Sequence, residues 1–122
     1  MSTGDLLISE IRGVCVVTFR TASILDAATV GTIAKQLYQL VDQEARRKLV
    51  LDFSEVRFLT SQMLGVLISL HKKSQAIDGK VVLCGIRTEL GKVFKITRLD
   101  KMLSFAENEE AALETFGVSG RA

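Results

Sequence analysis

Two adjacent hydroxyl side chains, Thr60 and Ser61, are the residues of this chain whose types and position best suit a chemical role. They follow the apolar pair Phe58-Leu59 and precede a run of apolar residues with helical spacing. Side-chain oxygens of Ser and Thr accept hydrogen bonds from the unpaired amides of a first helical turn. The pair is therefore predicted to stand at the start of a helix, where capping is the simplest role for either residue.

The other reactive side chains do not form a recognisable catalytic or metal site. His71, Cys15 and Cys84 are too few and too far apart for a zinc site of the usual spacing. Neither Cys has the basic or His neighbour that activates a thiol, and both stand in apolar runs, so buried free thiols are expected. Glycine-rich phosphate-binding motifs are absent from the sequence as well. We therefore expect no enzyme activity, no catalytic residue, no metal and no cofactor.

The segment around the hydroxyl pair predicts a buried strand followed by a largely buried helix. The run from Leu49 to Phe53 is largely apolar and too short for a helix, which is typical of a buried parallel strand. The helix after Thr60 leaves one narrow polar stripe, formed by Ser61, Gln62, Gly65, Ser69, Lys72 and Lys73. Gly inside a helix costs roughly 1 kcal/mol relative to Ala, so Gly65 indicates that another surface comes close there. That surface belongs either to a partner or to a neighbouring element of the same chain.

The remaining chain alternates strands with helices. Further strands are expected at Leu6–Glu10, Val14–Phe19, Lys80–Ile86 and Met102–Phe105, with Arg20–Leu25 as a connection. Further helices are expected after caps at Asp26 and Thr88, and from Asn108 to about Phe116. This alternation predicts an α/β domain with a mixed, mostly parallel sheet of four to five strands and about four helices.

Length and composition favour a small, single-domain protein. The 122 residues suit one domain over 1–122, with a core at about 6–118 and a frayed C-terminal tail. The net charge of +2 is too small to suggest direct nucleic-acid binding. Basic residues concentrate between His71 and Lys101, whereas the last helix is acidic. Solvated surface charge is the ordinary explanation of this distribution, and a docking patch is the functional alternative. No apolar stretch approaches the ~18 residues of a membrane span, and no signal peptide is evident, so a cytoplasmic location is expected.

The order of strand, turn, apolar pair, hydroxyl pair and apolar helix resembles the central motif of STAS domains, which include the bacterial anti-sigma factor antagonists. The segment that carries the resemblance is Phe58-Leu59-Thr60-Ser61-Gln62-Met63-Leu64-Gly65. Two further segments, Val81-Val82-Leu83-Cys84-Gly85-Ile86 and Ala111-Ala112-Leu113, resemble the next strand and the last helix of the family. The resemblance extends from about Leu6 to Val118. It implies a STAS fold and a protein-interaction switch.

In antagonists of this family, a Ser or Thr at the start of the central helix is phosphorylated. The present chain departs from the family pattern, because Thr60 stands at the acidic position and Gln62 at the phosphoacceptor position of many antagonists. In other STAS proteins, including those of stressosomes, the phosphorylated residue directly follows the acidic position, and Ser61 fits that register. The resemblance thus implies Ser61 as the candidate phosphoacceptor and Thr60 as the second candidate.

The resemblance also implies a partner: an anti-sigma factor with serine kinase activity and a histidine-kinase-like ATPase fold. The implied partner-binding residues are Asp26, Thr60, Ser61, Gln62, Gly65 and Ser69. For Asp26, helix capping is the alternative role. We expect a monomer or a weak homodimer. The alternative function is that of a STAS scaffold or a subunit of a transporter or lipid-trafficking system, which would bind a small ligand or an ATPase subunit.

Overall fold

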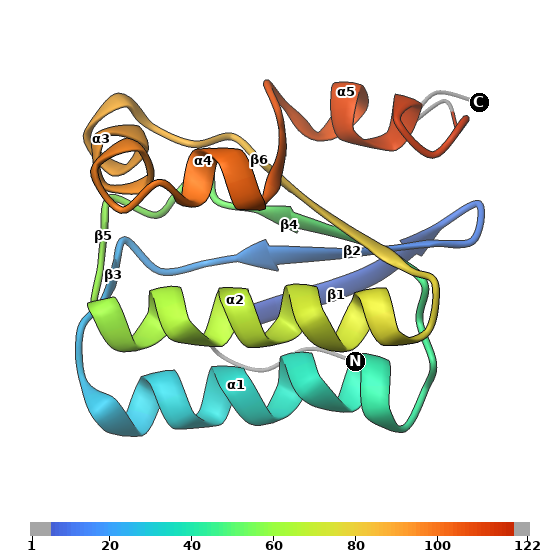
Figure 1. Cartoon of the computed structure of the whole chain (residues 1–122), viewed down its shortest axis with the longest axis horizontal. Helices are drawn as coiled ribbons and strands as arrows, with labels where there is room; N and C mark the ends of the chain where they lie inside the picture. Colours follow the sequence, from blue (N-terminus) through green and yellow to red (C-terminus); the bar gives the residue numbers. More distant parts are fainter. Residues whose placement is uncertain (1–5, 119–122) are drawn as a thin grey trace.

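The computed structural model describes residues 6–118, which fold around a five-stranded sheet with the order β1-β2-β4-β6-β7 (Figure 1). The strands are β1 (Leu6–Ile11), β2 (Val14–Phe19), β4 (Lys48–Asp52), β6 (Lys80–Cys84) and β7 (Ser104–Ala106). The first two strands pair antiparallel, and every later neighbour in the sheet is parallel. The expected α/β fold with a mixed, mostly parallel sheet is therefore confirmed.

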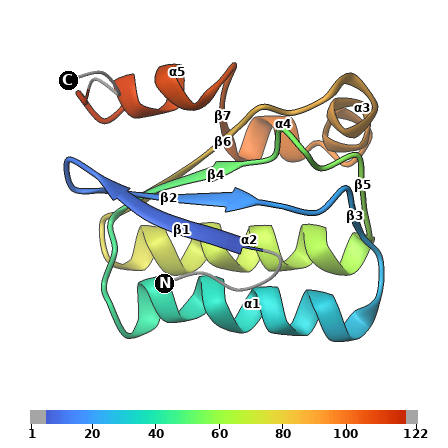
Figure 2. The same cartoon turned by 180° about the vertical axis from the view of Figure 1, so that it is seen from behind.

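Helices cover both faces of the sheet, as Figures 1 and 2 show from opposite sides. Two long helices, α1 (Ala27–Asp42) and α2 (Ser61–Ala76), lie together on one face. The short helix α5 (Glu109–Glu114) lies on the other face, and α3 (Thr88–Ile96) and α4 (Leu99–Met102) lie together at one end of the molecule. Residues 6–118 thus contain five helices where about four were expected.

The core follows from the alternation of side chains along the central strand β4. Leu49 and Leu51 belong to the large cluster that packs against α1 and α2, whereas Val50 belongs to the smaller cluster beneath α5. All three side chains are fully buried. A strand covered on both faces must be apolar throughout, which explains the continuous apolar run in the sequence. Both thiols, Cys15 and Cys84, are buried and unpaired, as expected.

Several predicted boundaries need correction. Thr88 does not cap α3: Arg87 occupies the cap position without a side-chain hydrogen bond, and Thr88 is the first helical residue. Strand β6 ends at Cys84 instead of Ile86, because Gly85 adopts φ +69°, which no extended strand allows. The last strand begins at Ser104, since the short helix α4 takes up the chain to Met102.

Other expectations about chain ends are confirmed or lie beyond the described region. Asp26 caps α1 and Asn108 caps α5, each by accepting a hydrogen bond from the amide three residues later. The C-terminal tail that was expected to fray lies outside the described residues from position 119 onward. None of the helices within residues 6–118 has the length and apolar character needed to cross a membrane.

Candidate functional site

A small parallel ribbon brings the starts of α1 and α2 together. Its strands, β3 (Ser23–Ile24) and β5 (Phe58–Leu59), form a separate two-stranded sheet at the left of Figure 1. The ribbon continues into the second helix start, because the amide of Thr60 donates to the carbonyl of Ile24 at 3.1 Å. Asp26 and Thr60, the caps of α1 and α2, therefore follow strands that are paired with each other.

The cap of α2 is Thr60, so the choice that the sequence left open between Thr60 and Ser61 is resolved. The Thr60 hydroxyl oxygen accepts a hydrogen bond from the amide of Met63 at 3.3 Å. Ser61 is the first residue of the helix and is exposed. Its hydroxyl makes no hydrogen bond to any other residue in the described range 6–118. Ser61 thus has a free, solvent-facing oxygen directly beside a capped helix terminus.

The polar stripe that the sequence predicted on α2 is not exposed along its whole length. Ser61, Gln62 and Gly65 are exposed, whereas Ser69 is half-buried. Further along, Lys73 is engaged within the protein, with its ammonium 2.9 Å from a carboxylate oxygen of Asp42 and 5.1 Å from the centre of the Tyr38 ring. Within the described residues, the stripe therefore faces solvent over the first two turns of the helix and again at Lys72, which is exposed.

Gly65 does not serve a contact within the described part of the chain. A Cβ atom built at this position would have no neighbouring atom within 4 Å. Of the two explanations for this glycine, the one in which a neighbouring element of the same chain packs on it is therefore wrong. The other explanation, close approach by a partner, stays a prediction.

Two exposed apolar side chains, Leu25 and Phe58, flank the helix starts and were missed by the sequence analysis. Leu25 is 58% exposed and Phe58 is 56% exposed. Their neighbours Ile24 and Leu59 face the core, so the alternation of a strand turns Leu25 and Phe58 outward. Large apolar side chains that stay exposed beside a polar rim are typical of protein-interaction surfaces. The signal in the sequence was weak, since each ribbon strand has only two residues.

The two helix starts differ in charge. The carboxylate of Asp26 accepts hydrogen bonds from the Thr29 hydroxyl at 2.7 Å and the Thr29 amide at 2.9 Å. These bonds lower the pKa of Asp26, so the residue is anionic at neutral pH and complements the dipole of α1. The start of α2 has a neutral cap and no acidic residue in its first turn. Only the α1 terminus therefore has a negative charge of its own.

The structure offers no arrangement for metal binding or thiol chemistry in the region it describes. No group of three or more His, Cys, Asp or Glu side chains within residues 6–118 could hold a metal ion. Burial, together with the nearby carboxylates of Asp52 and Glu109, raises the pKa of Cys84 to about 12. Burial likewise raises the pKa of Cys15. Both thiols thus stay protonated and unreactive at neutral pH.

A family model for the STAS domain matches residues 6–112, which include every element from β1 to the first part of α5. The chain belongs to the STAS domain family. BtrV of Bordetella bronchiseptica, described as a candidate anti-sigma factor antagonist, is 27% identical to it over 93 residues, which cover 76% of this chain and 79% of BtrV. This STAS domain is therefore similar to anti-sigma factor antagonists in sequence.

Solved structures of related proteins share its fold. An anti-sigma factor antagonist domain protein from Planctomyces limnophilus has a TM-score of 0.81 at 20% identity, covering 93% of this chain and 98% of the other. The Bacillus cell fate determinant SpoIIAA in its phosphorylated form has a TM-score of 0.71 at 19% identity, covering 91% and 98%. The expected STAS fold is thus confirmed.

Proposed function

We propose that this STAS domain binds an anti-sigma factor with serine kinase activity and a histidine-kinase-like ATPase fold, and that phosphorylation of Ser61 releases the complex. The observation that carries the proposal is the exposed hydroxyl of Ser61 at the first position of α2, which bonds to no other residue within 6–118. A role of this kind needs no catalytic residue in the domain itself and would be exercised in the cytoplasm.

The local geometry separates modification from folding. Because Thr60 supplies the helix cap, a phosphate on Ser61 would leave the cap bond to Met63 intact. A phosphoserine adds about −1.5 to −2 charges at neutral pH and three acceptor oxygens. The amides and dipole of a helix terminus favour that charge within the domain, whereas a carboxylate on a docked partner would repel it. Phosphorylation would therefore change what the surface binds without unfolding the domain.

The proposed interface combines polar and apolar groups around the two helix starts. Gly65 leaves room for close approach, and Leu25 and Phe58 provide apolar contact area at its edge. Buried apolar side chains contribute much of the binding energy in protein interfaces, whereas surrounding polar groups set orientation. The residues proposed for the interface are Leu25, Asp26, Phe58, Thr60, Ser61, Gln62, Gly65 and Ser69.

Substitutions at Ser61 test this proposal against a structural role. Ser61→Asp should weaken binding to the cognate anti-sigma kinase, whereas Ser61→Ala should preserve binding and abolish phosphate incorporation by that kinase. Isothermal titration and mass spectrometry of the kinase-treated domain measure the two effects. Gln75→Glu, which adds the same charge at the exposed far end of α2, is the matched control and should bind as the wild type does.

Two results would count against the proposal. Phosphate found at Thr60 instead of Ser61 would move the switch to the capping residue. Unchanged binding by Ser61→Asp, together with no phosphate at either hydroxyl, would leave a STAS scaffold without a phospho-switch. A transporter ATPase subunit recovered with the tagged domain from its native cells, in place of an anti-sigma kinase, would favour the alternative function.

A further inference from the structure

The outer edge of β1 is the longest unpaired strand edge in the described structure. β1 pairs with β2 over its whole length, from Leu6 opposite Phe19 to Ile11 opposite Val14, with no bulge in the register. No other strand within residues 6–118 pairs with its second edge, and β1 lies in the foreground of Figure 2. The opposite edge strand, β7, has only three residues.

The hairpin turn determines which backbone groups of β1 point outward. Arg12 and Gly13 have φ values of +50° and +88°, as a two-residue type I′ turn requires. The residues that flank such a turn, Ile11 and Val14, form a hydrogen-bonded pair, and such pairs alternate along an antiparallel ladder. The main-chain N–H and C=O groups of Ile8 and Glu10 therefore point away from β2.

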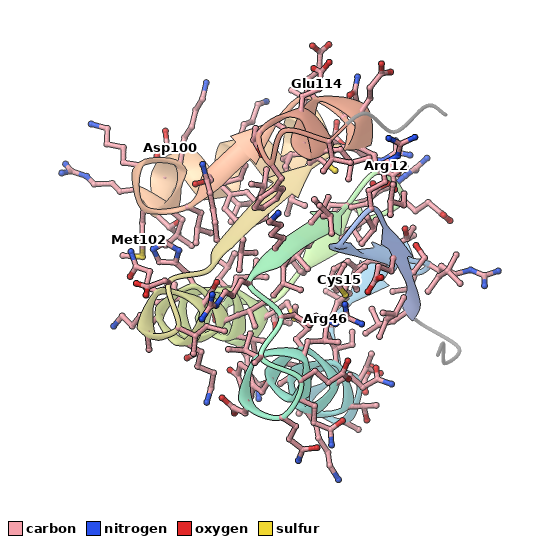
Figure 3. The ribbon with its side chains drawn as sticks, turned by 90° about the vertical axis from the view of Figure 1, so that its right-hand side faces the viewer. Arg12, Cys15, Arg46, Asp100, Met102 and Glu114 are labelled. Atoms are coloured by element: carbon pink, nitrogen blue, oxygen red, sulfur yellow. The ribbon has the colours of Figure 1, made fainter. Side chains whose placement is uncertain are left out.

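Within Leu6–Ile11, the strand lacks the sequence features and the bulge that usually protect an edge against pairing. Natural edge strands are guarded by Lys, Pro, bulges or covering elements, and β1 has neither Lys nor Pro in its sequence Leu6–Ile11. Its only charged side chain, Glu10, forms an ion pair with Arg46. Figure 3 shows Arg46 beside Cys15, between the β1–β2 hairpin and α1. The negative charge that could repel a second strand is therefore compensated.

A groove runs beside this edge and offers space for incoming side chains. Its volume is about 290 Å³, and its lining includes Ile8, Ser9 and Glu10 from β1 and Leu40 from α1. Inward-facing side chains of an added strand would lie over this groove, because alternate residues of neighbouring strands share a face.

We propose that β1 pairs antiparallel with β1 of a second copy of this chain, with Ser9 on the two-fold axis. In this register, Ile8 of each copy exchanges main-chain hydrogen bonds with Glu10 of the other. Leu7, which is 41% exposed, lies opposite Ile11 of the second copy, so two apolar residues meet. The small Ser9 side chains face each other at the close, non-hydrogen-bonded position.

The charges and the burial of β1 favour this occupant and this register. A symmetric register centred on Ile8 would need the backbone of Leu6, which is fully buried and cannot be reached. The strand is also self-complementary, since the outward main-chain groups of Ile8 meet those of Glu10 and the apolar Leu7 meets Ile11, while the charge of Glu10 is compensated within each copy by Arg46. The ribbon that forms the proposed docking surface belongs to a different sheet, so the dimer does not depend on the proposed function and would present two docking surfaces.

Disulfide cross-linking tests both the pairing and its register. Ser9→Cys places two thiols across a pair whose Cα atoms are about 4.5 Å apart, within the ~4.4–6.8 Å that a disulfide spans. Mild oxidation should convert this variant to a covalent dimer. Leu7→Cys is the matched control: the two positions lie about 13 Å apart in the dimer, four residues along the ladder, and should not cross-link. The buried Cys15 and Cys84 do not compete, because neither is accessible.

Charge substitution at the same position provides an independent measurement in solution. Ser9→Lys and Ser9→Glu, each analysed alone by sedimentation equilibrium, should raise the dimer dissociation constant by roughly fivefold or more through like-charge repulsion. An equimolar mixture of the two variants should restore association as a heterodimer. Gln75→Lys is the charge control and should dimerise as the wild type does, because residue 75 is exposed at the end of α2.

Three results would contradict the proposed dimer or its register. A wild-type protein that stays monomeric at all concentrations, with no cross-linking of Ser9→Cys, overturns the proposal. The β1 edge would then not be a site for a second copy of this chain. Dimerisation that persists unchanged in Ser9→Lys assigns the dimer to another surface and also overturns it. Cross-linking of Leu7→Cys in place of Ser9→Cys refutes the register.

Discussion

The starts of α1 and α2 share one framework but differ in their side chains. Each helix has 16 residues, follows a two-residue strand of the same ribbon, and has an exposed Gly as its fifth residue, Gly31 or Gly65. A Cβ atom at either glycine would meet no neighbour within 4 Å. The cap of α1 is an anionic carboxylate that accepts two hydrogen bonds, whereas the cap of α2 is a hydroxyl that accepts one at 3.3 Å.

The two helix starts therefore differ in the side chains at the cap and at the first helical residue, and not in the backbone. Asp26 already provides the negative charge that the dipole of α1 attracts, and α1 then begins with Ala27. The start of α2 has no such charge and begins with the modifiable Ser61. An added anion would therefore find an uncompensated helix terminus only at α2, although the two termini are neighbours.

The largest difference between the two helix starts is expected when the same bulky side chain replaces each of the two matching glycines. Gly65→Arg should reduce partner binding by about a hundredfold or more, because a long side chain would stand where the partner approaches. Gly31→Arg, in the same position of α1, should have a much smaller effect. Calorimetric titration against the partner measures both.

The melting temperatures of these two variants are the control. Because both positions are open, Arg should fit at either one and increase stability by up to about 1 kcal/mol through better helix propensity. A cooperative melting transition that disappears in Gly65→Arg would show that the fold, and not the partner, needs this glycine. Equal loss of binding in the two variants would mean that the interface covers both helices alike.

Removing the cap of α2 should give the next largest effect, this time on stability. Thr60→Ala should lower the free energy of unfolding by about 1 kcal/mol, since the amide of Met63 loses its acceptor. Ser61→Ala should change it little, because the Ser61 hydroxyl makes no bond within the described residues. Urea denaturation of the two variants measures the difference, and an inverted order would assign the cap to Ser61.

The smallest expected effect is a difference in acid sensitivity between the two helix starts. Hydrogen bonds from Thr29 lower the pKa of Asp26 below its ordinary value of 3.8. The stabilisation is therefore complete above the unfolded pKa and is lost as the pH falls through the lower, folded pKa. The melting temperature of the wild type should exceed that of Asp26→Asn near pH 5, and the gap should narrow towards about pH 2.

A variant at α2 provides the comparison for this titration. Thr60→Ser exchanges one neutral cap for another, so its difference from the wild type should not vary over the same pH range. A gap for Asp26→Asn that stays constant with pH would show that the carboxylate is not more acidic in the fold than in the unfolded chain.

Local signals in the sequence were sufficient where one residue governs its own surroundings. Asp26 was predicted as a cap and is one, and Asn108, predicted to open the last helix, is its cap, because each side chain bonds an amide only three residues away. The same rule failed at Thr88, since the chain turns into α3 one residue earlier and leaves Arg87 in the cap position. The predicted and the observed cap of α3 differ by one residue, and residue-type patterns do not locate a helix boundary that accurately.

The features that were missed depend on pairing between distant segments. Ser23–Ile24, inside the predicted connection, and Phe58–Leu59 form strands only because each segment pairs with the other. The outward direction of Leu25 and Phe58 follows from that pairing and cannot be read from either segment alone. For the same reason, the sequence predicted the exposed polar strip of α2 but not the apolar side chains beside it.

The shortness of the β3–β5 ribbon has a consequence for how the protein opens. Only two residues of each strand are paired, whereas β4 lies between two neighbours along its length. Segments with few buried contacts open at lower free energy than the centre of a sheet. The amide protons of Phe58 and Thr60, which bond to Ala22 and Ile24, should therefore exchange with deuterium earlier than those of β4. Both helix starts would loosen in the same event, so a ligand that clamps either one would slow exchange at the other.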